Sequence, residues 1–106
     1  MAIMLNDEKG DALRAKINGE TARMQWKALD RFFAAGAVIA VSSDLDLVEV
    51  AYRIASDDKD AIVKWMAENR VARVSDAQAS SWQEADASLW TVVVKPWILV
   101  QQEKTH

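Results

Sequence analysis

The residue types that most often carry chemistry near neutral pH are almost missing from this chain. It has no cysteine, and its single histidine is the last residue, His106. Thiolate nucleophiles, zinc–thiolate sites and disulfides are therefore excluded, and the serines lack a histidine to act as their base. The three glycines, at positions 10, 19 and 36, are too scattered for a phosphate-binding loop. The sequence favours a protein that is not an enzyme, and we predict no cofactor.

Two clusters of carboxylates are the first candidates for a site, because carboxylate oxygens are the ligands that Mg²⁺ and Ca²⁺ prefer. Neither cluster has the glycine and the ligand order of a calcium loop. Both lie where helices are expected to begin, and acidic residues there stabilise a helix by roughly 0.3–1 kcal/mol. Helix capping is thus the preferred interpretation, and we predict no metal site. The first cluster holds Asp44, Asp46 and Glu49, and the second holds Asp57, Asp58 and Asp60.

A second candidate lies in the first helical stretch, where Glu20 and Arg23 are one turn apart and Trp26 follows after another turn. An arginine beside an indole could grip a carboxylate or phosphate with its planar fork. An exposed ion pair beside a core tryptophan explains the same spacing more simply. The alternative function is a small-ligand or divalent-metal binding domain, possibly a minor enzyme, whose site would combine Arg23, Trp26, Asp46 and Glu49.

The charge balance argues against nucleic acid as a partner. The net charge is −3, whereas nucleic-acid binders usually show a basic excess on one face. Lys9, Lys16, Arg23 and Lys27 share one side of the first helical stretch, but Glu20 lies among them, so a solvated face explains them better.

Five tryptophans are the most prominent large side chains. Trp26, Trp65 and Trp82 fall in amphipathic patterns and are expected in the core. Trp90 and Trp97 flank Pro96 in an apolar terminal segment, where core packing is the first expectation and a homodimer interface the second, since tryptophan is enriched at interfaces. The predicted interface residues are Trp90, Val93, Trp97 and Leu99.

These residues must be positioned by an alternation of helices and strands. The periodicity predicts helix over 8–34, with a weak point at Asn18–Gly19 and Thr21 as a possible second N-cap. Ser75 and Gln78 have the spacing of a capping box. Gly36 and Asn69 are expected to end helices. The remaining predictions are strands over 37–41, 71–74 and 89–101, and helices over 44–55 (where 44–50 also alternates partly like a strand), 56–69 and 75–86.

The order of elements predicts one α+β domain over residues 1–106, with a sheet of about three strands covered by about four to five helices. Residues 1–7 and 102–106 are expected to be loose tails. Pro96 cannot donate a ladder hydrogen bond, so the terminal strand should kink there or lie at a sheet edge. Such an apolar edge invites another chain. No signal peptide and no apolar run of about 20 residues is present, so we expect a cytoplasmic protein without a membrane partner.

The chain resembles a family of small bacterial proteins catalogued only as a domain of unknown function. The resemblance spans roughly residues 11–102 and rests on the order and spacing of several short segments; Gly19 and Asn69 depart from the pattern. It implies a standalone bacterial domain and carries over no catalytic residue. We therefore expect a non-enzymatic protein that acts by protein–protein contact as a homodimer. The carrying segments are 20–23 with Trp26, 32–34 with 36–39, 44–51, Trp65, 89–90 and 93–97.

Overall fold

The computed structural model describes the backbone of residues 2–103 and the side chains of residues 10–103. Of the two expected loose tails, Met1 and residues 104–106 lie outside the described residues, and the backbone of residues 2–7 is helical. The helices are α1 (Ala2–Glu20), the 3₁₀ turn η1 (Trp26–Ala28), α2 (Asp30–Ala34), α3 (Leu47–Ala55), α4 (Lys59–Ala67) and α5 (Asp76–Ala85). The strands are β1 (Ala22–Gln25), β2 (Val38–Val41), β3 (Val71–Arg73), β4 (Ser88–Val94) and β5 (Trp97–Gln101).

The strands form one five-stranded sheet in the order β1-β4-β5-β2-β3. The β2–β5 pair is parallel, and the other three pairs are antiparallel. The α+β class predicted from the sequence is confirmed, but the prediction of about three strands is wrong, because the sheet has five. Two segments account for the difference.

The first is residues 22–25, which were expected to continue a helix and instead form β1. The Thr21 hydroxyl donates to the carbonyl oxygen of Ile17 at 2.8 Å, and the Thr21 N–H donates to that of Asn18 at 3.2 Å. Thr21 therefore satisfies carbonyls at the end of α1, and its predicted role as the N-cap of a second helix is wrong. The chain then pairs with β4, with Arg23 opposite Trp90.

The second is the predicted strand over 89–101, which is a hairpin. Pro96 cannot donate a ladder hydrogen bond, so the strand ends before it. Lys95 and Pro96, joined by a cis peptide bond, form the turn between β4 and β5. The strand is thus interrupted at Pro96, which was one of the two expected alternatives. The other alternative, an edge position, is wrong, because both strands have a neighbour on each side and the edges of the sheet are β1 and β3.

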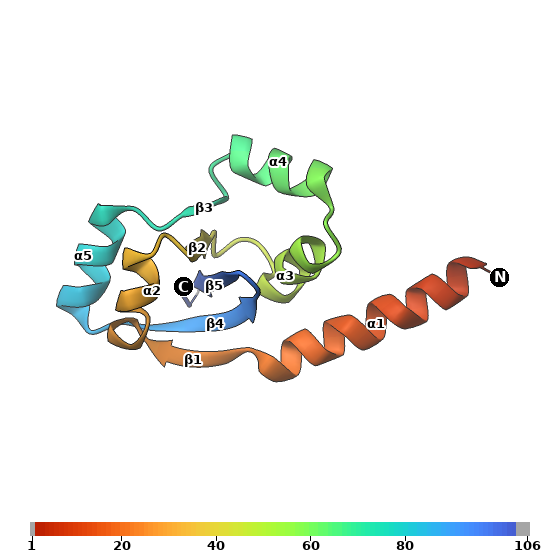
Figure 1. Ribbon diagram of the computed structural model, residues 1–106, viewed down its shortest axis with the longest axis horizontal. Coiled ribbons are helices and arrows are strands. Elements are labelled where there is room, and N and C mark those ends of the chain that lie inside the picture. Colours follow the sequence, from red (N-terminus) through yellow and green to blue (C-terminus); the bar gives the residue numbers. More distant parts are fainter. Residues whose placement is uncertain (1, 104–106) are drawn as a thin grey trace.

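Helices cover both faces of the sheet, and alternate residues of β2, β4 and β5 enter two separate cores. On the α5 face, Leu89, Ile98 and Val100 pack with Trp26 and Trp82. On the α3 face, Val92 and Leu99 pack with residues of α1 and α3. Figure 1 shows α2 and α5 together at one end of the sheet, α3 and α4 toward the other, and α1 extending away from the body.

The local signals for helix ends hold in the structure. Ser75 and Gln78 form the predicted capping box at the start of α5. Gly36 follows α2 with φ of 75°, and Asn69 follows α4 with φ of 58°, both in the left-handed region that ends helices. Trp26 and Trp82 are buried as predicted, whereas Trp65 is half-buried. Within residues 2–103, no helix is both long and apolar enough to cross a membrane.

Candidate functional site

A hollow on the α3 face lies beside Trp90, and we call it the Trp90 cleft. It has a volume of about 530 Å³ and is lined by residues from the end of α1, the loop before α3, and strands β4 and β5. The Gln101 side-chain amide donates to the carbonyl oxygens of Ser42 at 2.8 Å and Leu45 at 2.7 Å. These bonds hold the loop in place, so the wall of the cleft is built by a residue that sequence reasoning missed.

Arg23 lies beside Trp90, one of the residues that line the cleft. Its guanidinium carbon lies 5.4 Å from the centre of the Trp90 ring, because the two residues are paired across β1 and β4. The guanidinium also forms an ion pair with Glu103 at 3.1 Å. Arg23 is thus held between an indole and a carboxylate, and its charge is already balanced.

The carboxylates of the loop before α3 are engaged in local contacts. Asp46 is the N-cap of α3 and accepts hydrogen bonds from the backbone N–H groups of Val48 at 3.0 Å and Glu49 at 3.4 Å. Asp44 accepts hydrogen bonds from the hydroxyl of Ser42 and the guanidinium of Arg70. The Ser42 bond and then the Arg70 guanidinium lower the pKa of Asp44.

Glu49 is the centre of a network that joins α1, α3 and α4. It accepts from Arg14 at 2.8 Å and from Arg53 at 3.1 Å, and Arg53 pairs with Asp58 at 3.1 Å. The hydrogen bond from Arg14 is the main reason that the pKa of Glu49 lies below its ordinary value. The second acidic cluster also caps a helix, since Asp58 accepts from the Ala61 N–H at 3.2 Å. These contacts stabilise the fold, and they leave few unpaired carboxylates in the two acidic clusters to bind a ligand.

The predicted ligand constellation is divided by the sheet. Trp26 is 1% exposed on the α5 face, with its ring centre 5.2 Å from that of Trp82. Arg23, Asp46 and Glu49 belong to the α3 side. Arg23 and Trp26 were expected one turn apart on a helix, and this prediction is wrong because residues 22–25 form a strand. No group of three histidine, cysteine, aspartate or glutamate side chains that could hold a metal ion occurs among the residues the structure describes.

The predicted interface residues separate in the same way. Val93 is 55% exposed and lies on the α5 face, whereas Trp90 and Trp97 are half-buried on the α3 face. Leu99 is 0% exposed and belongs to the core of its own chain. Only Val93 and the exposed parts of the two indoles are available for contact with a partner.

The fold and its sites define a small α+β domain, helix-covered on both faces of a mixed sheet and stabilised by internal ion pairs. Residues 12–102 match the family described as "Protein of unknown function (DUF2288)", and the chain belongs to that family. It is similar to the protein in the "NMR solution structure of PA1075 from Pseudomonas Aeruginosa". That similarity has 40% sequence identity and a TM-score of 0.78, and covers 89% of this chain and 87% of that one. A search of curated proteins gives no match.

Proposed function

We propose that this protein is not an enzyme and acts by protein–protein contact as a homodimer, through a surface formed by the edge strand β1 together with Val93. We call it the β1 surface. The observation that carries the proposal is the state of β1. All four of its residues are exposed, and it pairs with β4 on one side only. An edge strand of this kind offers unpaired backbone donors and acceptors to another strand.

The side chains around β1 favour contact with another protein chain. Met24 is 39% exposed and lies opposite Leu89, so it shares the α5 face with Val93. Arg23 is the single charged residue of β1, and Glu103 balances it from the α3 face. The β1 surface thus combines an open edge, two exposed apolar side chains and no net repulsive charge.

A second copy of this chain is the partner that best fits the β1 surface. Pairing β1 with β1 of another copy across a twofold axis is antiparallel and self-complementary, as a closed dimer requires. It would join two five-stranded sheets and bring the Met24 side chains of the two copies to the joined edge, with Val93 on the neighbouring strand. The open edge expected for the terminal strand is therefore found at β1, one of the two strands that lie at an edge.

The test is the oligomeric state, measured by native mass spectrometry and light scattering on untagged protein. We expect a dimer for the natural sequence and a monomer for Met24→Lys, because a lysine at a sheet edge opposes pairing. We also expect a monomer for Val93→Lys, because it places a charge on an exposed apolar position of the neighbouring strand β4. Circular dichroism should show that both variants remain folded. The matched control is Val63→Lys on α4, a valine with 64% exposure far from β1, which should stay dimeric. A monomeric natural protein, or dimers that survive both β1 substitutions, would overturn the proposal.

A further inference from the structure

We propose that an apolar groove at the opposite edge of the sheet binds a small carboxylate with an apolar body. We call it the Trp97 groove, and it has a volume of about 250 Å³. It lies between α3, α4 and strands β2, β3 and β5, on the α3 face. This inference does not depend on the proposed dimer, since the groove and the β1 surface involve different residues at different edges.

The groove exists because α4 packs loosely against the sheet. Helices α3 and α5 each contribute buried residues to a core, whereas α4 has no buried residue. Its apolar residues Ile62 and Met66 instead line the groove, opposite Ile54 of α3 and Trp97 of β5. Met66 is 55% exposed. The apolar side of this amphipathic helix is thus left uncovered where a ligand could fill it.

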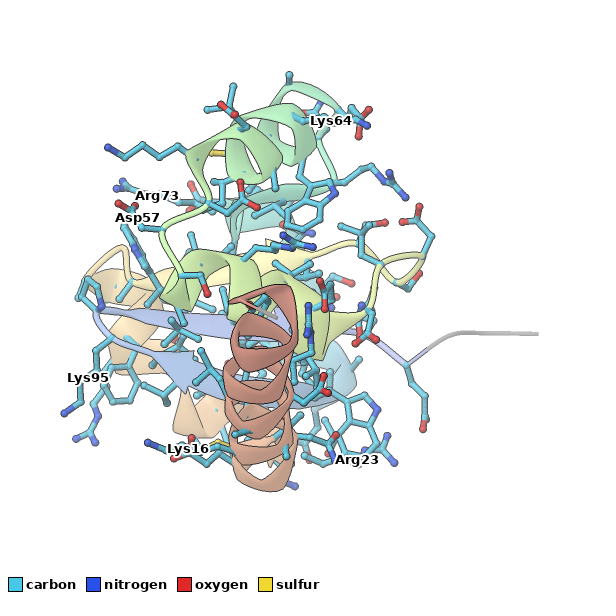
Figure 2. The ribbon with its side chains drawn as sticks, turned by 90° about the vertical axis from the view of Figure 1, so that its right-hand side faces the viewer. Lys16, Arg23, Asp57, Lys64, Arg73 and Lys95 are labelled. Atoms are coloured by element: carbon cyan, nitrogen blue, oxygen red, sulfur yellow. The ribbon has the colours of Figure 1, made fainter. Side chains whose placement is uncertain are left out.

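Arg73 provides the single charged group in the lining. Its guanidinium carbon lies 5.5 Å from the centre of the Trp97 ring, so the indole holds the charge beside the apolar wall. Arg73 forms no ion pair with any described carboxylate, although Asp57 lies on the same side of the molecule (Figure 2). Four other arginines, Arg14, Arg23, Arg53 and Arg70, each have such a partner.

The chemistry of the lining selects the class of ligand. Its guanidinium matches one carboxylate through two parallel hydrogen bonds, and the remaining walls are apolar. A polyphosphate would leave charges unpaired beside one arginine, and an amine would be repelled by it. The volume lies below the ~300–1,000 Å³ range of typical ligand pockets, so the apolar body must be short. A medium-chain monocarboxylate meets these conditions.

The first experiment compares three probes on the natural protein by two-dimensional ¹H–¹⁵N NMR, with sodium octanoate, octylammonium and hexanoate added separately. We expect octanoate to shift the Trp97 indole resonance and the amides of α4. Octylammonium has the same apolar body with the opposite charge and should bind at least about tenfold more weakly. Hexanoate has two methylenes fewer and should bind roughly tenfold more weakly. Equal binding of octanoate and octylammonium, or shifts confined to other surfaces, would overturn the proposal.

The second experiment uses two variants of the protein. One removes the positive charge of Arg73, and the other places a negative charge in the groove. Arg73→Gln should weaken octanoate binding about tenfold or more, and Met66→Glu should abolish it by repulsion. The matched control is Arg31→Gln, because Arg31 also lies over an aromatic ring, that of Phe32 at 4.8 Å, but away from the groove. The control should bind octanoate like the natural protein. Unchanged binding by folded Arg73→Gln would refute the role of the guanidinium, and if that variant misfolded, the probe comparison would still decide.

Discussion

At the scale of single residues, Glu49 carries the densest set of polar contacts described here. It joins Arg14 of α1 to Arg53 of α3, and Arg53 continues to Asp58 at the start of α4. Arg14 also lies 4.0 Å from the centre of the Tyr52 ring. Glu49 was expected from the sequence to be a ligand-binding residue, but it pairs with Arg14, which is 35 residues away in the chain. Its role in the structure is to fix three helices relative to one another.

The substitution Glu49→Gln should lower the free energy of unfolding at pH 7 by about 1 kcal/mol, because it removes the charge that two arginines share. The pKa of Glu49 is lowered in the folded state, from an ordinary value of 4.5. Its contribution is therefore fully present above pH 4.5 and is lost as the pH falls through the lowered folded pKa. Urea unfolding at several pH values should show the difference between variant and natural protein shrinking in acid. Glu84→Gln, at an exposed position of α5, is the control. A stability difference between Glu49→Gln and the natural protein that grows in acid would contradict the stabilising role of the Glu49 carboxylate.

At the scale of elements, three of the described helices begin at residues whose side chains satisfy free backbone N–H groups. Asp46 starts α3, Asp58 starts α4 and Ser75 starts α5. In α5 the exchange is reciprocal, since the Ser75 hydroxyl accepts from the Gln78 N–H at 3.1 Å and the Gln78 side chain accepts from the Ser75 N–H at 3.0 Å. Capping therefore accounts for much of the acidic and hydroxyl content that resembled candidate sites.

We expect Ser75→Ala to destabilise the protein by about 1 kcal/mol, because the first turn of α5 loses its cap. Thermal unfolding followed by circular dichroism measures the effect. Ser80→Ala, at an exposed position inside the same helix, should change the melting temperature little. Equal effects of the two substitutions would show that the capping box does not stabilise α5.

At the scale of the whole molecule, the sheet separates two cores and both depend on the central strands β4 and β5. Successive residues of β5 serve opposite faces: Ile98 and Val100 enter the core under α5, and Leu99 enters the core under α3. Leu99, which was expected at a dimer interface, therefore lies in the core of a single chain. Surface for a partner remains at the two edges, β1 and β3.

Leu99→Ala should cost about 2–5 kcal/mol of stability, because it leaves a cavity at a position with 0% exposure. Val93→Ala, at a position with 55% exposure two residues from the same hairpin turn, should cost far less. Chemical denaturation at matched concentrations compares them. A Leu99→Ala protein that stays as stable as the natural one but loses its dimer would instead place Leu99 at the interface.

The sequence by itself determined the features that depend on near neighbours along the chain. The capping box at Ser75 and the helix ends at Gly36 and Asn69 each involve atoms a few residues apart, so local patterns reveal them. The helix expected from residue 44 instead begins at Leu47, with Asp46 as its N-cap. The burial of Trp26 and Trp82 was also predicted, because large apolar side chains on the apolar side of an amphipathic segment usually lie in the core of a small domain.

The tertiary structure decided everything that depends on a distant partner. Residues 22–25 carry no strand pattern of their own and become β1 because β4 offers them a ladder of hydrogen bonds, which overrides local propensity. The pairing of Arg14 with Glu49 and the enclosure of the Trp97 groove likewise join segments far apart in sequence. Periodicity reports which side of an element is apolar but not which element covers it, so the candidate surfaces emerge only when the sheet is assembled.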